Sequence, residues 1–239
     1  MNMKTRSLKD LKEQAERACV SQFSFFLDPK ECFEAQNTYR EAIFWGGYDE
    51  AERKMVCFPA DWDEEPVFPI HILHIRLKNK KAEITHRDCL GALMHLGMDR
   101  ACFGDLVKTP HGFIVFTTDA AATVVQLNLE KIGREGVVIS EEEGTFEIPE
   151  RKYKEESKTV ASARLDCVVA AFLNVSRSKA MEYLRSERVT LNYITEKNPD
   201  KQIKDGDIMS VRGHGKARLH FTGDVSKKGR MYLVIHYYI

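Results

Sequence analysis

The sequence predicts an α+β protein with two α/β subdomains followed by a small basic domain. Two observations carry this prediction: the order of the expected elements between residues 68 and 148, and two short helices followed by strands between residues 163 and 239. The charge-rich stretch 149–162 has few large apolar residues, which indicates a linker, with a partly ordered strand at "KTVAS" as the alternative. With 239 residues, 43% of them apolar and 30% charged, the chain is long enough for more than one domain.

An N-terminal α/β subdomain is expected over residues 1–67. Residues 7–20 form an amphipathic pattern, and "FLDPKECFEAQNTYR" predicts a second helix with Pro29 at its first position. "AIFWGG" and "KMVCFP" are typical of strands, the first of them ended by a glycine pair. The proline- and acid-rich "FPADWDEEPVFP" indicates a loop, and we place the first domain boundary inside it.

The middle subdomain, 68–148, is predicted to have the order β-α-β-β-α-β. "PIHILHIRL", "GDLVK", "HGFIVFT" and "EGVVISE" are the strands, and "HRDCLGALMHLG" and "TDAAATVVQLNLEKIG" are the helices. This order is the ferredoxin-like, split-βαβ arrangement, which RRM-like RNA-recognition modules share with many unrelated functions. Phe113 and Phe116 fall on opposite faces of their strand, which favours core packing over a paired base-stacking role.

A basic helix is expected to begin after Ser176, whose hydroxyl can accept from a free amide of the first turn. Ala180, Tyr183 and Leu184 follow with the spacing of a packed face. Arg177 and Lys179 lie in the first turn, where the helix dipole disfavours cations. A phosphate there would meet free amides and two cations together. The alternative is a basic first turn that only faces water.

The formal net charge is zero, but the charges are unevenly distributed. From Arg164 to the end there are 14 Lys and Arg against 8 Asp and Glu, a net of +6. The preceding part carries 22 against 28, a net of −6. A basic C-terminal third is typical of a nucleic-acid-binding module, although basic residues also cover ordinary soluble surfaces.

The composition also bears on the compartment. No apolar run approaches the roughly 18 residues that would predict a membrane span, and the N-terminus lacks the apolar core of a secretory signal. The six cysteines lack C-x-x-C spacing, which favours reduced, buried thiols over a disulfide framework. We therefore expect a cytoplasmic protein without a membrane partner.

Three patterns that invite an enzymatic or metal-binding interpretation do not support one. "HRD" at 86–88 is found in protein kinases, but Leu93 stands where a kinase needs asparagine. His71 and His74 are three residues apart on a strand and point to opposite faces, so they cannot easily converge on a metal. "FWGGYDEA" is a poor version of a cofactor-binding glycine loop. We expect no catalytic residue, no metal and no cofactor.

A second RNA contact is expected in the middle subdomain, at His86, Arg87 and Arg100. The same residues could contact a neighbouring domain instead. For Arg87 and Asp88, a structural role at the start of the helix is an equal alternative.

The C-terminal third resembles a known RNA-binding domain, the one named after small-subunit ribosomal protein S-four. The resemblance rests on "RLD" at 164–166, "SRSKA" at 176–180, Val189, Asn192 and the stretch from Lys204 to Val211. It implies an S-four-type domain at 163–239, in which two short helices pack on a small sheet and a β-hairpin extends it. Glu187 and Tyr193 stand where that family usually has glycine.

The resemblance implies an RNA-contacting surface on the second helix and on the hairpin. Arg and Lys there would contact the phosphate backbone rather than read the sequence. For Arg164 and Asp166 a mutual ion pair or a helix-cap role is the alternative, and for the hairpin an ordinary solvated turn. The expected RNA-binding residues are Arg164, Ser176, Arg177, Ser178, Lys179, Arg185, Arg188, Asn192, Lys204, Lys216, Arg218, Lys227, Lys228 and Arg230.

Nearly the whole chain resembles the bacterial YlmH family, through "FWGGYDEAERK", "THRDCLGALMHLGMDRACFGDLV" and "SKKGRMYLVIHYY". This resemblance implies a cytoplasmic, non-catalytic factor on the large ribosomal subunit that acts in rescue of stalled nascent-chain complexes. Ribosomal RNA and tRNA would be its partners, and we expect a monomer. Two alternatives stay open: a pseudouridine-synthase-like enzyme using the aspartate of "RLD", and an adaptor that binds a cell-division protein.

Overall fold

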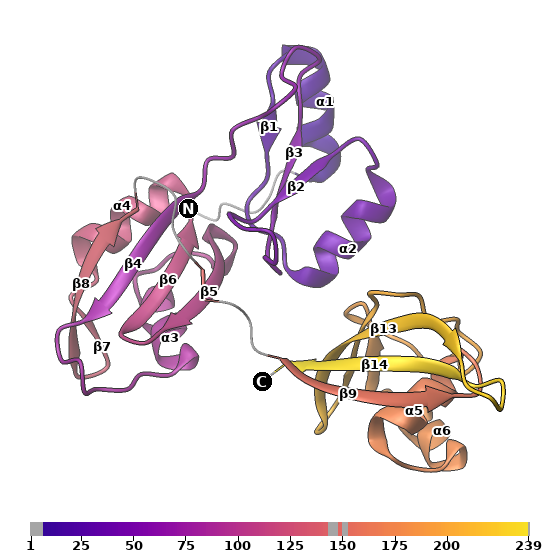
Figure 1. The fold of residues 1–239 in the computed structure, drawn as a ribbon. Coiled ribbons are helices and arrows are strands. Elements are labelled where there is room, and N and C mark those ends of the chain that lie inside the picture. Colours follow the sequence, from indigo (N-terminus) through magenta and orange to yellow (C-terminus); the bar gives the residue numbers. More distant parts are fainter. Residues whose placement is uncertain (1–6, 143–147, 150–152, 239) are drawn as a thin grey trace. The chain divides into compact units, whose positions relative to one another are not determined.

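The computed structural model describes residues 7–142, 148–149 and 153–238 (Figure 1). Its contacts divide the chain into two compact units, Met1–Pro149 and Glu150–Ile239, called unit 1 and unit 2 below. The expected N-terminal and middle subdomains therefore belong to one unit. Both units mix helices with antiparallel sheets, so the chain is an α+β protein.

The first part of unit 1 is a three-stranded sheet with two helices. Its strand order is β1-β3-β2, with β1 at Gln22–Phe23, β2 at Ile43–Trp45 and β3 at Met55–Phe58. Helices α1 (Leu8–Ala18) and α2 (Pro29–Thr38) each begin with a reciprocal capping box, and Pro29 is the first residue of α2 as expected.

The second part of unit 1 is a five-stranded antiparallel sheet with the order β5-β6-β4-β8-β7. Helices α3 (His86–His95) and α4 (Asp119–Asn128) cover one face of it (Figure 1). Helix α4 ends at Asn128, earlier than the sequence pattern indicates, because residues 131–132 form the short strand β7. The strands are β4 (His71–Leu77), β5 (Phe103–Thr109), β6 (Gly112–Thr117), β7 (Lys131–Ile132) and β8 (Glu135–Glu141).

On the other face of the five-stranded sheet, strand β6 is covered by the first part of unit 1. Ile114 and Phe116 of β6 pack there with Phe26 and Met55. The Arg53 guanidinium fixes this arrangement, since it donates to the carbonyl oxygens of Phe103 (3.0 Å) and Phe26 (3.0 Å). Phe113, on the helix side, and Phe116 are both buried, so the expectation of core packing is confirmed.

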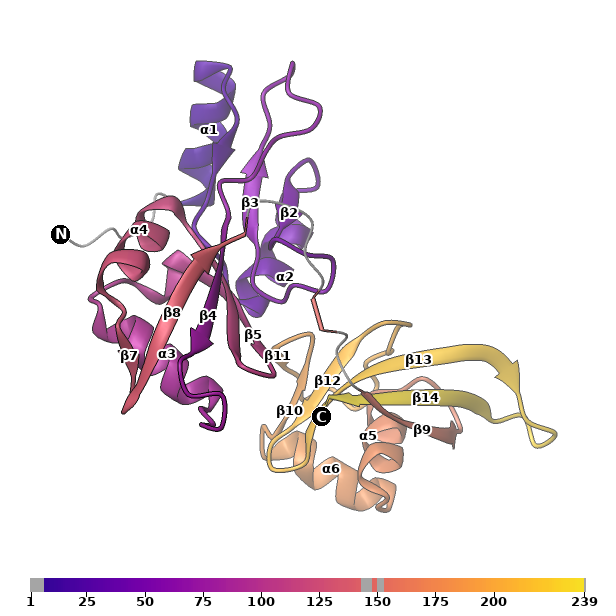
Figure 2. The same cartoon turned by 60° about the vertical axis from the view of Figure 1, so that its left-hand side comes forward.

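Unit 2 is a six-stranded antiparallel sheet with the order β11-β10-β12-β13-β14-β9. Helices α5 (Leu165–Leu173) and α6 (Arg177–Arg185) lie side by side on one face (Figure 2). The strands are β9 (Tyr153–Val160), β10 (Val189–Leu191), β11 (Ile194–Thr195), β12 (Ile208–Val211), β13 (Gly215–Val225) and β14 (Met231–Tyr238).

The stretch 149–162, expected to be a linker, differs from the expectation. Residues 150–152 lie outside the described residues, but Tyr153–Val160 forms β9, which pairs with all of β14. Because β9 is an edge strand, most of its side chains are exposed or half-buried, and an edge strand can therefore have the charge-rich composition of a linker.

Five of the six cysteines are buried and all six are free thiols, as expected. Burial raises the pKa of Cys57 and of Cys89 to about 12 and that of Cys32 to about 11, so these thiols stay protonated at neutral pH. None of the helices in the described part of the chain is long and apolar enough to cross a membrane.

Candidate nucleic-acid interface

Helix α6 begins as the sequence predicts. The Ser176 hydroxyl accepts a hydrogen bond from the backbone amide of Lys179 at 3.3 Å, so the N-cap is confirmed. Ala180 and Leu184 are buried against α5 and the sheet, which turns the opposite face of α6 to solvent. Arg177, Ser178, Lys179 and Arg185 are exposed on that face.

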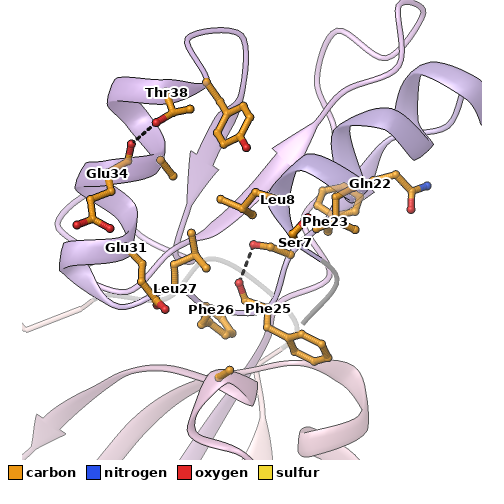
Figure 3. A pocket seen from close by; sticks show the side chains of 15 residues that line it. Ser7, Leu8, Gln22, Phe23, Phe25, Phe26, Leu27, Glu31, Glu34 and Thr38 are labelled. Carbon is orange, nitrogen blue, oxygen red and sulfur yellow. Dashed lines mark hydrogen bonds between the residues drawn. The ribbon is translucent and has the colours of Figure 1, made fainter. Parts of the chain in front are cut away.

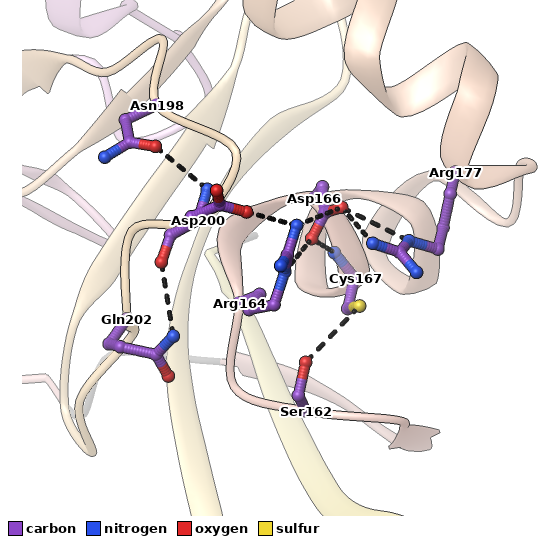
Figure 4. Close-up of polar contacts among 8 residues, drawn as sticks. All are labelled: Ser162, Arg164, Asp166, Cys167, Arg177, Asn198, Asp200 and Gln202. Carbon is purple, nitrogen blue, oxygen red and sulfur yellow. Dashed lines mark hydrogen bonds and ion pairs between the residues drawn. The ribbon is translucent and has the colours of Figure 1, made fainter.

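Asp166, the second residue of α5, lies between two guanidinium groups (Figure 4). Arg177 donates to its Oδ2 from Nη2 at 2.5 Å and from Nε at 3.2 Å. Arg164 donates to Oδ1 and Oδ2 at 3.2 and 3.3 Å, and the backbone amide of Cys167 donates to Oδ1 at 2.8 Å. Arg164 also pairs with the carboxylate of Asp200. The predicted alternative of an Arg164–Asp166 ion pair is therefore confirmed.

The Asp166 carboxylate is only 4% exposed. Burial by itself would raise its pKa, but the hydrogen bonds from Arg164 and Arg177 outweigh burial and lower the pKa to about 2. The carboxylate is therefore charged at neutral pH and supplies an anion to the first turn of α6. Since the Arg177 side chain is still 58% exposed, it has one side toward Asp166 and another toward solvent.

The other two cations of α6, Lys179 and Arg185, are not held by a buried partner. The Lys179 ammonium pairs with Glu182 at 2.5 Å, one turn along the exposed face. No side-chain hydrogen bond or ion pair engages Arg185 within the described residues. Lys179 and Arg185 are thus the side chains of α6 that an incoming phosphate could contact without disturbing the core.

A second basic group lies where α6 meets the β12–β13 turn. The Arg188 guanidinium stacks 4.6 Å from the centre of the Tyr183 ring and donates to the carbonyl of Arg212 at 2.9 Å. The Tyr183 hydroxyl lies 3.1 Å from Nε2 of His214. The sequence pattern places Tyr183 on a packed face and does not single out Arg212 or His214. Both of these residues lie in the basic, glycine-rich stretch "VRGHGKAR".

The residues after α6 mostly serve the fold. Asn192 donates to Asp207 at 2.9 Å and accepts from the amide of Ile208 at 2.9 Å, so its side chain holds a turn together. Glu187 and Tyr193 have positive φ values of 57° and 67°. These are the two positions at which the resemblance described above leads to an expectation of glycine, a residue that adopts positive φ without a steric cost.

The lysines and arginines expected on the hairpin do not form one group. Lys227 and Lys228 are exposed at the tip, whereas Arg230 donates to the Thr159 carbonyl oxygen at 2.7 Å. Lys216 lies at the far end of β13, about 30 Å from the tip at roughly 3.3 Å per residue. Its ammonium is 4.5 Å from the centre of the Tyr238 ring.

The last two predicted residues of unit 2 differ in exposure. Lys204 is exposed. Arg218 is half-buried, and its Nε has no hydrogen-bond partner among the described residues.

The three residues expected to form an RNA contact in the middle subdomain have different surroundings. His86 and Arg87 are exposed in the first turn of α3, where Asp88 completes the capping box with Thr85. Arg100 instead donates to the carbonyl oxygens of Phe103 and Gly104. Burial, with a smaller contribution from Arg53, lowers the pKa of Arg100 to about 10. Arg100 therefore stabilises a turn through these two hydrogen bonds.

An apolar groove of about 810 Å³ lies in the first part of unit 1 (Figure 3). Glu31 and Glu34 stand on its α2 side, and Glu31 already caps α2 with Asp28. Such a lining suits apolar contact rather than proton transfer. Its apolar walls are Leu8, Leu11, Phe23, Phe25, Phe26, Leu27, Ala35, Tyr39 and Ala101.

Comparison with known proteins identifies the family to which the chain belongs. Residues 63–145 match the family described as "Putative RNA-binding domain in YlmH", so the class is that of proteins with this domain. The chain belongs to the YlmH family. It is 30% identical over 212 residues to the "Ribosome-associated protein quality control protein P2" of Bacillus subtilis (strain 168), across 86% of this chain and 82% of that protein.

One solved structure is also similar, the "Cell division protein ylmH from Streptococcus pneumoniae". The match has a TM-score of 0.46 and 21% sequence identity, and it covers 60% of this chain and 96% of that one.

Proposed function

We propose that this protein is a non-catalytic, cytoplasmic RNA-binding factor that docks as a monomer on structured RNA. The RNA is ribosomal RNA of the large subunit, with tRNA beside it, and the process is the rescue of stalled nascent-chain complexes. The observation that carries the proposal is the exposed basic face of α6, with Lys179 and Arg185 directed to solvent on a part of the chain with a net charge of +6. The B. subtilis relative, by its name, is ribosome-associated.

In this proposal residues 163–239 act as an S-four-type domain, and β9 extends its sheet. Residues 68–148 are a ferredoxin-like, RRM-like subdomain, and residues 1–67 provide a further contact to the ribosome or to a protein. Arg177 and Lys179 touch phosphates at the start of α6, while Lys227 and Lys228 touch a second site from the hairpin tip. Such contacts position the protein on the RNA without reading its sequence.

The alternative of an RNA-modifying enzyme rests on Asp166, the aspartate of "RLD". A catalytic aspartate must reach a substrate, whereas Asp166 is 4% exposed and bonded to Arg164 and Arg177. This geometry favours a positioning role. Loss of base modification in RNA when Asp166 is replaced by Asn, in a variant that still folds and binds, would favour the enzyme instead.

The salt dependence of binding to protein-free large-subunit ribosomal RNA tests the proposal. Each phosphate neutralised should lower the logarithm of the affinity by about 0.7 to 0.9 per unit of log salt. We expect a steep slope for the wild type and a shallower one for Lys179→Glu/Arg185→Glu. A binding constant that does not change with salt would instead favour an adaptor that recognises protein.

A further inference from the structure

The match to "Putative RNA-binding domain in YlmH" spans residues 63–145 and so includes the whole five-stranded sheet of unit 1, which raises the question of which surface would touch RNA. In RNA-recognition modules, aromatic side chains on the open face of the sheet stack on bases. Here Phe116 and Ile114 of that face are buried under Phe26 and Met55. Bases therefore cannot stack on Phe116 or Ile114 while unit 1 is folded, which favours a contact at another surface.

Acidic and basic side chains of this sheet lie at opposite ends of its strands. At one end, where β4 begins, the His71 ring is 2.5 Å from Glu141, and Glu142 lies 2.9 Å from His74. The opposite end is formed by three loops that follow β4, join β5 to β6 and join β7 to β8. The hydrogen bond from the Leu77 amide to the His111 carbonyl (2.9 Å) brings the first two loops together.

Basic residues gather at that second end, and we call six of them the end cluster. All six are exposed. The end cluster consists of Lys78, Lys80, Lys81, Lys108, Lys131 and Arg134. The Lys78 amide bonds to the Gly136 carbonyl at 2.9 Å, and Gly136 is the register partner of Lys131, so two of the three loops are in direct contact.

The side chains of the end cluster lack internal partners, which distinguishes them from the basic residues of helices α1 and α2. Within the described residues no hydrogen bond or ion pair engages them, whereas Lys9, Lys12 and Lys30 each pair with a glutamate. Glu83, Glu130 and Glu135 are the acidic residues of the same loops, so the cluster keeps a net positive charge.

We propose that the end cluster is a phosphate-backbone contact for RNA, and that unit 1 holds RNA with the loop end of its sheet rather than with the sheet face. Unpaired cations grouped on three adjacent loops and the strand ends beside them attract a polyanion and are not compensated within the domain. The loops, held by backbone hydrogen bonds at the strand ends, present these cations without exposing the apolar core. The inference rests on the proposed function, since it adds a second contact to the same RNA.

The test is the full-length variant Lys80→Glu/Arg134→Glu, which changes two loops of the end cluster without touching a buried residue. Its control, Lys9→Glu/Lys30→Glu, makes the same change in net charge on α1 and α2. Circular dichroism first establishes that both are folded. Affinity for protein-free large-subunit ribosomal RNA is then measured across a range of salt concentrations, next to wild type and Lys179→Glu/Arg185→Glu.

We expect the end-cluster variant to bind more weakly than the control, with the salt slope reduced by about 2, since about one unit is lost per phosphate contact. If it binds like the control while Lys179→Glu/Arg185→Glu loses affinity, the end cluster is not an RNA contact, although the proposed function stands. If neither variant differs from wild type, or wild type does not bind, both proposals fail. Weaker binding to intact subunits but not to protein-free RNA would overturn the inference in favour of an acidic protein.

Discussion

Arg177 at the start of α6 and Asp166 at the start of α5 form a short ion pair, with Nη2 2.5 Å from Oδ2. This pair ties together the two helices of unit 2 at the ends where they begin. It also resolves the unfavourable placement of a cation in the first turn of a helix, because the carboxylate of the neighbouring helix lies beside it. Arg177 therefore has a role in the fold whether or not RNA is bound.

Replacement of Asp166 by Asn should destabilise unit 2 by roughly 1.5 to 3 kcal/mol, the typical range for buried hydrogen bonds to charged groups. The change preserves shape but leaves Arg164 and Arg177 as like charges around a neutral amide. Chemical denaturation of the full-length protein measures the loss. Asp200→Asn is the control: its side chain is 63% exposed, and we expect at most about 1 kcal/mol. Equal losses in the two variants would refute the central role of Asp166.

Acid should separate the wild type from Asp166→Asn. Arg164 and Arg177 lower the folded-state pKa of Asp166 to about 2, below its ordinary value of 3.8, although burial opposes them. The resulting stabilisation is complete above pH 3.8 and is lost as the pH falls through about 2. Between these values the melting temperature of the wild type should fall more steeply than that of the variant. If the melting temperatures of the two proteins change equally with pH over this range, the assigned pKa is contradicted.

Phe26→Ala should destabilise unit 1 by about 3 to 5 kcal/mol, because Phe26 is 1% exposed and belongs to the same buried cluster as Phe116. Val67→Ala, at a side chain that is 87% exposed, is the matched apolar control and should change the free energy of unfolding by less than about 0.5 kcal/mol. A small effect of Phe26→Ala would show that the sheet face is not covered as described, and base stacking there would have to be reconsidered.

Glu187→Gly should stabilise unit 2 by about 0.5 to 1 kcal/mol. Its φ of 57° is costly for a residue with a Cβ atom, and glycine removes that cost. The lost ion pair with Lys197 is exposed on both sides and offsets little of the gain. Glu182→Gly, within α6, should do the opposite and cost about 1 kcal/mol. Thermal unfolding of the two variants compares the signs, and a loss of stability in Glu187→Gly would contradict this explanation.

Local chemistry made much of the fold predictable. The cap at Ser176 and the buried positions Ala180 and Leu184 follow from spacing and side-chain type, and the structure confirms them. The sequence allows only a partly ordered strand at "KTVAS", whereas β9 begins at Tyr153, because an edge strand facing water carries no clear apolar alternation.

Contacts between distant residues were harder to foresee. "RLD" indicated an ion pair within the motif, but the approach of Arg177 depends on how α5 and α6 pack, which periodicity does not specify. The covering of the five-stranded sheet by Phe26 likewise joins residues far apart in sequence. The end cluster went unnoticed because its lysines come from three loops that only the sheet register brings together.

The most direct test of the central claim is sedimentation of the protein with purified large ribosomal subunits. The informative variant is Lys179→Glu/Arg185→Glu, because replacing Arg177 would also remove one of the two guanidinium partners of Asp166. Lys9→Glu/Lys30→Glu serves as the charge-matched control. With all three proteins folded, we expect the wild type and the control to sediment with the subunit and the α6 variant to stay in solution. If the α6 variant sediments as fully as the wild type, α6 is not the RNA contact that the account requires.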